Sequence, residues 1–159
     1  MVLEPQKRIS EKGLTVWRIS GAIHSLISLL VAGSIIGLTI VFDWPIWIIA
    51  IATLLFVIDA YVVVVLIPSL RWKRWRYEVR ENEIELQHGI FVIKRTLVPM
   101  IRVQHVDTRQ GPIMCKYELA TVTVSTAATV HEIPALDLDE AEELRFFISK
   151  LARVADEDV

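Results

Sequence analysis

Residues 19–42 read ISGAIHSLISLLVAGSIIGLTIVF, and residues 44–67 read WPIWIIAIATLLFVIDAYVVVVLI. The first run contains no Asp, Glu, Lys or Arg, and the second contains only Asp59. Each run has 24 residues. As a helix, such a run is roughly 36 Å long and crosses a hydrocarbon core of about 30 Å with some tilt. The two runs therefore predict two transmembrane helices.

The residues around these runs predict the borders and orientation of a helical hairpin. Asp43 and Pro45 indicate a tight turn between the helices. The eight Lys and Arg residues of 1–76 all lie before the first run or after the second, so the positive-inside rule places both chain ends in the cytoplasm. A cleaved signal peptide followed by one anchor is disfavoured, because the first apolar run is too long.

Tryptophan side chains support the same borders, since amphipathic rings are enriched at membrane interfaces. The five tryptophans are Trp17, Trp44, Trp47, Trp72 and Trp75. We therefore expect a multi-pass cell-membrane protein with three parts. These are a cytoplasmic N-terminal segment (1–18), a transmembrane hairpin (19–67, with helices at 19–42 and 44–67) and a cytoplasmic domain (68–159).

Small residues recur at four-residue spacing in the first helix, with Leu29 filling the gap in the series: Gly21, Ser25, Gly33 and Gly37. Small side chains allow two helix backbones to approach closely. One interpretation is packing against the protein's own second helix. The other is a docking face for another membrane protein, since a two-helix hairpin has little room to bury every such face itself.

Two polar residues, His24 and Asp59, lie inside the predicted spans at similar depths from the inner end. An isolated charge at such a depth costs several kcal/mol, so each residue needs a partner. The two side chains can pair across the hairpin or contact a partner subunit, whereas two helices alone cannot enclose an ion pathway. Ser25 and Ser28 lie near His24, but no nucleophile motif surrounds them.

The composition argues against several other classes of protein. The chain has 159 residues, 53% of them hydrophobic, and a mean hydropathy of +0.47, which excludes an ordinary soluble domain, a disordered chain and a secreted disulfide scaffold. Residues 1–76 carry a net charge of +4 and residues 77–159 a net charge of −6. The acidic second half argues against a nucleic-acid partner.

We expect no enzyme, no metal and no cofactor. Cys115 has no recognisable catalytic context, and the chain contains no phosphate-binding glycine loop and no nucleophile elbow. The histidines outside the spans lack the spacing of metal ligands. They are His88, His105 and His131.

After Arg76 the pattern changes from helical to alternating, which is typical of strands. Turns are expected at His88-Gly89 and at Gly111-Pro112, the second followed by one helical turn. The expected strands cover residues 77–86, 90–97, 101–106, 120–125 and 130–133. An amphipathic C-terminal helix should begin near Asp139, and its apolar face should consist of Leu138, Ala141, Leu144, Ile148, Leu151 and Ala155.

Three stretches carry a resemblance to a known family: VPMIRVQHV at 98–106, QGP at 110–112 and LATVTVSTA at 119–127. With the preceding hairpin and the Trp75-Arg76-Tyr77 opening, they resemble the bacterial pleckstrin-homology (PH-like) domain membrane proteins of the YdbS-like kind. Glu118 departs from the family pattern, which commonly has Gly there, and residues 127–129 replace a Gly-rich turn.

The resemblance implies an α+β membrane protein. Its cytoplasmic part would be a partly open β-barrel of about seven strands capped by the C-terminal helix. It also implies a partner, because such proteins often pair with a larger relative built from repeats of the same unit. Phosphoinositide binding is disfavoured, because the first hairpin loop, where such a basic site usually lies, reads Arg80-Glu81-Asn82-Glu83.

A basic-aromatic run follows the second helix: Arg71, Trp72, Lys73, Arg74, Trp75 and Arg76. Its basic side chains can gain roughly 1 kcal/mol each from anionic lipid at the membrane surface. One interpretation is that the run sets the membrane topology and anchors the chain. The alternative is that anionic lipid regulates the protein through this run.

Two functions remain from the sequence. The first is a membrane-anchored interaction subunit in the cell envelope, assembling with a larger family member or with itself as a hetero- or homo-oligomer. As a finer hypothesis, the complex protects against membrane-active antimicrobial peptides under envelope stress or stabilises other membrane proteins. The alternative is an inner-leaflet module that binds membrane lipid or a small ligand.

Overall fold

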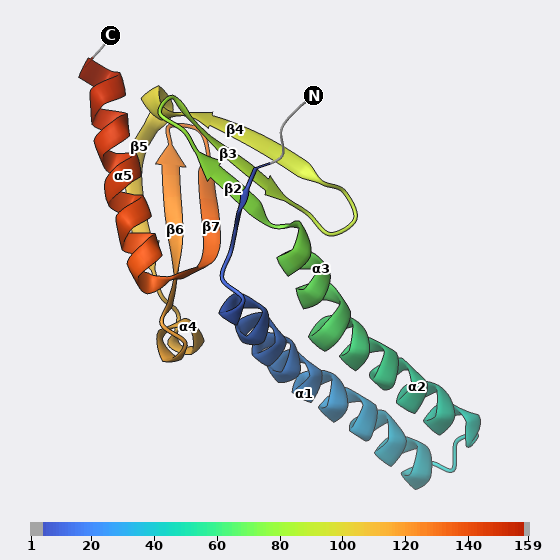
Figure 1. Cartoon of the computed structure of the whole chain (residues 1–159). Helices are drawn as coiled ribbons and strands as arrows, with labels where there is room; N and C mark the ends of the chain where they lie inside the picture. Colours follow the sequence, from blue (N-terminus) through green and yellow to red (C-terminus); the bar gives the residue numbers. More distant parts are fainter. Residues whose placement is uncertain (1–4, 158–159) are drawn as a thin grey trace. The chain divides into compact units, whose positions relative to one another are not determined.

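The computed structural model describes residues 5–157 and divides the chain into two compact units, residues 17–70 and residues 1–16 with 71–159 (Figure 1). The helical elements are α1 (Lys12–Val41), α2 (Trp47–Tyr61), the π-helical segment η1 (Val62–Leu66), α3 (Ile67–Arg74), the 3₁₀ turn η2 (Met100–Arg102), α4 (Pro112–Lys116) and α5 (Leu138–Glu157). The strands are β1 (Lys7–Arg8), β2 (Arg76–Val79), β3 (Glu83–His88), β4 (Lys94–Pro99), β5 (Val103–Arg109), β6 (Leu119–Thr126) and β7 (Val130–Asp137).

The first unit is the predicted helical hairpin. Two continuous helical stretches, Lys12–Val41 and Trp47–Arg74, are long and apolar enough to cross a membrane. Between them, Asp43 adopts a left-handed backbone with φ of 50°, a conformation that aspartate tolerates better than most residues. The second helix begins at Trp47 and not at Trp44, because Trp44 still belongs to the turn, where its N–H donates to the Thr39 carbonyl at 2.9 Å.

The second helical stretch contains one turn of π-helix, η1, which ends two residues before Pro68. Proline has no backbone N–H, and its ring clashes with the carbonyl four residues earlier in a regular α-helix. A wider π turn relieves that clash while the helix continues. The carbonyls around Val63 therefore lie in a locally widened stretch of the helix.

Within the described residues, the second unit contains seven strands in two open antiparallel sheets, ordered β1-β2-β3-β4 and β5-β6-β7. The expected strand number and C-terminal helix are confirmed, but the sheets do not close into a barrel. Six strands follow the hairpin, and β1 comes from the segment before it. The chain passes from the first sheet to the second through η2, where Met100 is fully buried.

Several predicted strand boundaries are wrong. Strand β5 ends at Arg109 and not at residue 106, and β7 continues to Asp137 and does not end at residue 133. Strand β4 begins at Lys94 and not at residue 90, because Gly89 has a φ of 134° and the following residues form a loop. Strand β5 begins at Val103 and not at residue 101, because η2 occupies residues 100–102. Glu118 has a φ of 54°, a left-handed backbone conformation that glycine adopts more readily than glutamate does.

The core of this unit lies between the sheets and α5. Its fully buried side chains come from both sheets, and Ala141, Leu144 and Ile148 of α5 are buried as predicted. Tyr77 of β2 is completely buried and donates its hydroxyl to Glu140 Oε1 at 2.7 Å, which links the first sheet to α5. The large buried residues are Tyr77, Ile84, Met100, Leu119, Ile133, Leu136, Ile148, Val122 and Val124.

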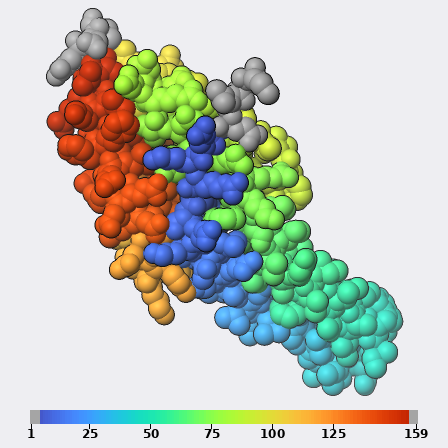
Figure 2. Space-filling view, viewed as in Figure 1, coloured from blue at the N-terminus to red at the C-terminus, as the bar shows by residue number. Residues whose placement is uncertain are grey.

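The N-terminal segment, residues 5–16, connects the two sheets. Strand β1 pairs with β2 of the first sheet, and the Ser10 N–H donates to the Ala135 carbonyl of β7 at 2.9 Å. Gly13 lies against Ala135, whose Cβ would be 2.5 Å from a Cβ on Gly13. Figure 2 shows this blue segment on the surface between the red helix α5 and the green strands of the first sheet.

Candidate functional site

The two membrane helices meet along a seam of small side chains. Gly21, Ala32 and Thr39 of α1 are buried, as is Ala52 of α2. The closest approach is at Gly21, where a Cβ would lie 2.6 Å from the Val63 carbonyl oxygen. Gly21 therefore packs against η1 within the hairpin, in agreement with the first of the two interpretations of the small-residue series.

Gly33 and Gly37 lie on a different side of α1. A Cβ at either position would have no atom within 4 Å. Each four-residue step turns a helix by about 40° beyond a full circle, so three steps from Gly21 rotate the series by about 120°. The four predicted packing residues thus divide into two pairs. Gly21 is buried and Ser25 is half-buried at the hairpin seam, whereas Gly33 and Gly37 are exposed.

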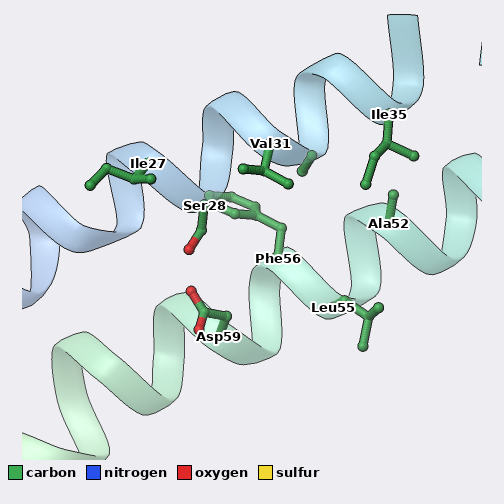
Figure 3. Close-up of a pocket in the computed structure, with 9 residues that line it drawn as sticks. Ile27, Ser28, Val31, Ile35, Ala52, Leu55, Phe56 and Asp59 are labelled. Atoms are coloured by element: carbon green, nitrogen blue, oxygen red, sulfur yellow. The ribbon is translucent and has the colours of Figure 1, made fainter. Parts of the chain in front are cut away.

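The structure does not bring His24 and Asp59 together. His24 is exposed, whereas Asp59 points into the hairpin toward Ser28 (Figure 3). Asp59 Oδ2 and Ser25 Oγ are buried and have no hydrogen-bond partner within the described chain. By contrast, the Ser34 and Thr39 hydroxyls each donate to the carbonyl four residues earlier at 2.8 Å.

Asp59 lies at one end of a cavity of about 280 Å³ between α1 and α2. Its lining is almost entirely apolar, apart from Asp59 and Ser28: Ile27, Ser28, Val31, Ala32, Ile35, Ala52, Leu55, Phe56 and Asp59. A carboxyl group without a donor in such surroundings is costly inside a membrane. The cavity is therefore suited to an apolar group that also carries a hydrogen-bond donor or a positive charge.

The basic-aromatic run divides into exposed and packed residues. Arg71 and Lys73 are exposed, while Trp75 is only 5% exposed and stacks on His88 with ring centroids 5.7 Å apart. Trp72 Nε1–H donates to the Ser10 carbonyl at 3.1 Å, and Arg74 donates to the Ile90 carbonyl. Arg76 belongs to β2. Several of these side chains therefore join the end of α3 to the N-terminal segment and to the loop after β3. All of these residues belong to the second unit, which we call the sheet unit.

The remaining candidate residues are dispersed. His105 is exposed on β5, and His131 Nε2 lies 2.9 Å from Thr129 Oγ1. Cys115 is exposed on α4, with its Sγ 3.7 Å from Gln110 Oε1. Among the residues that the structure describes, no three His, Cys, Asp or Glu side chains group so as to hold a metal ion.

The surroundings of His88 lead us to expect that the free energy of unfolding depends on pH. Burial, and then the charges of Lys94 and Arg71, lower the pKa of His88 below its ordinary 6.5. Below that pH the unfolded chain binds a proton more readily than the folded chain, so the free energy of unfolding falls as the pH falls. We expect His88→Asn to flatten this decline in unfolding temperature between about pH 7.5 and about pH 5.

The control for this measurement is His105→Asn, which alters an exposed ring on another strand. The unfolding temperature of this variant should fall with decreasing pH as much as that of the original protein. Equal declines in the original protein and in His88→Asn would contradict the role assigned to the burial of His88.

The comparisons with known proteins fit this architecture. Residues 23–152 match the model of the family described as "Bacterial PH domain". The chain belongs to this family. It is 52% identical over 156 residues to the UPF0699 transmembrane protein YdbS of Bacillus subtilis (strain 168), covering 98% of each chain. It is also 25% identical over 85 residues to the UPF0699 transmembrane protein YdbT of that strain, covering 51% of this chain and 17% of YdbT.

These findings confirm the predicted family and the membrane character of the chain. No solved structure matches it. Neither the family description nor the names of the relatives describes an enzyme.

Sequence reasoning missed two features near the candidate residues. Ser28, and not His24, faces Asp59 (Figure 3), and the seam spacing of alternating three and four residues could have indicated this. The apolar residues 90–93 form a loop in place of the start of a strand. Their lack of apolar-polar alternation after Gly89 was the available signal.

Proposed function

We propose that this protein is a non-enzymatic, membrane-anchored subunit that assembles with a larger PH-domain membrane protein of the cell envelope. In this proposal the hairpin crosses the membrane twice and both chain ends are cytoplasmic. The observation that carries the proposal is the open face at Gly33 and Gly37, where a neighbouring helix can approach the backbone of α1 closely.

The relatives support a partner of the same kind. The shared segment covers only 17% of YdbT, so that protein is much longer than this chain while resembling part of it. A homologous longer protein is a natural partner, because related PH-domain units can present complementary surfaces. Self-association through the same face is the other form of assembly.

The buried Asp59 gives a second reason to expect a partner. Its Oδ2 atom has no donor within the described chain, and exposed Ile27 and Leu55 border the same cavity. A partner side chain that donates a hydrogen bond there would remove the cost of an unpaired carboxyl group in the membrane. The cavity lies between α1 and α2, whereas Gly33 and Gly37 face away from the seam.

The test is gentle detergent purification of the tagged protein from its native membrane, followed by mass identification of co-purifying proteins. We expect a stoichiometric membrane partner, and we expect Gly33→Leu with Gly37→Leu to abolish its recovery while the hairpin stays folded. The matched control adds leucine to an exposed face of α2 through Ala50→Leu with Thr53→Leu and should retain the partner. Full recovery with the glycine double variant would refute assembly through this face.

The finer hypothesis is that the complex protects the envelope against membrane-active antimicrobial peptides. Cells lacking the protein should then be more sensitive to such peptides. The Gly33→Leu, Gly37→Leu variant should fail to restore resistance, whereas the α2 control variant should restore it. Unchanged sensitivity on deletion would contradict this role.

A lipid or small-ligand module is the second candidate function. One observation favours it: a cleft of about 490 Å³ in the sheet unit is lined by Arg71, His88, Lys94 and His131, together with one acidic residue, Glu132, and lies beside Trp75. Recovery of the protein alone with an enriched lipid would support this function. Changing Arg71, Lys73, Arg74 and Arg76 to Gln should then remove the lipid, provided that membrane orientation is unchanged.

A further inference from the structure

The loop between β3 and β4 contains a continuous apolar stretch, Ile90-Phe91-Val92-Ile93, in which Ile90 is half-buried and the other three residues are exposed. Phe91 is 89% exposed, the highest value for a large apolar side chain in the described part of the chain. Val92 is 80% exposed and Ile93 is 53% exposed. Contiguous exposed apolar side chains of this kind mark a surface that contacts a protein or a membrane.

The backbone of this loop is held in place. Gly89 has a φ of 134°, and a Cβ there would collide with the Val92 carbonyl, so the chain turns sharply at this point. The Ile90 carbonyl accepts a hydrogen bond from Arg74. The apolar side chains are therefore presented outward by a defined turn.

The charges around the loop match an anionic membrane surface. Lys94 and Arg95 follow the apolar stretch directly, and Arg74 at the end of α3 donates a hydrogen bond to the Ile90 carbonyl. The sequence contains no acidic residue between Glu85 and Asp107. Basic residues beside inserted apolar side chains are typical of segments that lie in the headgroup region of anionic bilayers.

The Arg74 contact links the loop to a point in the chain only a few residues after the second apolar run. Arg74, which bonds to the loop, is the last residue of α3. It follows Leu70 by four residues, or about 6 Å along a helix axis. The loop is therefore hydrogen-bonded to a residue that only four residues of chain separate from the second apolar run, and interfacial segments insert about 5–10 Å.

We propose that residues 90–93 insert into the membrane leaflet that faces the sheet unit, with Lys94 and Arg95 among anionic headgroups. The loop would then be a second membrane contact, in addition to the helical hairpin. This contact does not depend on assembly through Gly33 and Gly37, so the two proposals can fail separately.

The test measures the surroundings of the loop in the full-length protein. Cys115→Ala leaves no other cysteine, and Phe91→Cys then carries an environment-sensitive fluorophore. The protein is placed in lipid nanodiscs with and without roughly one anionic lipid in four. Quenching is measured with iodide in water and with nitroxide-labelled lipids.

We expect the Phe91 probe to lose most of its quenching by iodide and to gain strong quenching by lipid nitroxides, with a blue-shifted emission. The matched control is Phe146→Cys, which replaces a phenylalanine on α5 that is 71% exposed. Its probe should stay open to iodide and insensitive to lipid nitroxides. Lys94→Gln should weaken the lipid quenching at Phe91 in anionic nanodiscs, whereas Lys116→Gln should not.

Two results would overturn the proposal. Equal iodide quenching at Phe91 and Phe146 would show that the loop remains in water. Protection from iodide without lipid quenching would show that a protein surface, such as a second copy, covers the loop. Either result would leave the test of assembly through the glycine face unaffected.

Discussion

Replacing Gly21 with leucine is expected to unpack the membrane hairpin and to lower its free energy of unfolding by about 3 kcal/mol, the upper end of overpacking costs. The Cβ atom alone would lie 2.6 Å from the Val63 carbonyl oxygen and 3.2 Å from the Val64 Cα. Both neighbours are backbone, so no side-chain rotation can relieve the clash. Thermal unfolding of the purified protein in mild detergent measures the loss.

Gly33→Leu is the matched control for this experiment. It introduces the same side chain into the same helix at a position with no atom within 4 Å, so the unfolding temperature of the isolated protein should be almost unchanged. Equal unfolding temperatures for Gly21→Leu and Gly33→Leu would show that the helices do not meet at Gly21. The contrast also separates packing within the hairpin from contact with a partner, which only the Gly33 face is expected to provide.

Replacing Gly13 with valine is expected to detach the N-terminal segment from β7. The new Cβ would lie 2.5 Å from Ala135 Cβ, and separating the two would disturb the hydrogen bond from Ser10 N–H to the Ala135 carbonyl. The Lys12–Asp137 ion pair, at 3.2 Å, would be lost as well, although both side chains are about half exposed and contribute little. We expect a loss of about 2 kcal/mol in stability.

Protease cleavage of the N-terminal segment measures this effect locally, and thermal unfolding measures it globally. The control is Gly111→Val, because Gly111 has an extended backbone and no atom within 4 Å of a Cβ. Cleavage of the N-terminal segment should be faster in Gly13→Val only. Equal protection of both variants would contradict the proposed connection between the sheets.

The hairpin was predictable because its cause is local. A span of lipid demands an unbroken apolar helix, so length and charge alone indicate where the helices lie. The burial of Ala141, Leu144 and Ile148 was predictable for a similar reason, since an amphipathic helix shows its core face in its own periodicity. The family resemblance correctly indicated the strand number, but the register and boundaries needed the structure.

The candidate site was less predictable, because it depends on the rotation of each residue about its helix axis. Small errors in that rotation add up to large ones over several turns. The series Gly21, Ser25, Gly33 and Gly37 suggested one face, but helix rotation places its two halves on different sides. Equal depth suggested that His24 pairs with Asp59, whereas rotation about the helix axis turns Ser28 toward Asp59 (Figure 3). The depth of a residue in the membrane follows from its position along the helix. Which residues face each other depends on how the two helices are rotated about their axes.

The sequence by itself determined the membrane hairpin, the alternation of strands and the covering C-terminal helix, because each follows from local periodicity and from the solvent it faces. The tertiary structure alone decided that residues 7–8 add a strand to a sheet formed about 70 residues later, and that Gly13 meets Ala135 on the other sheet. Those contacts join segments on opposite sides of the hairpin in the sequence. No short-range pattern specifies them, because only the folded chain brings their backbones close enough to bond and pack.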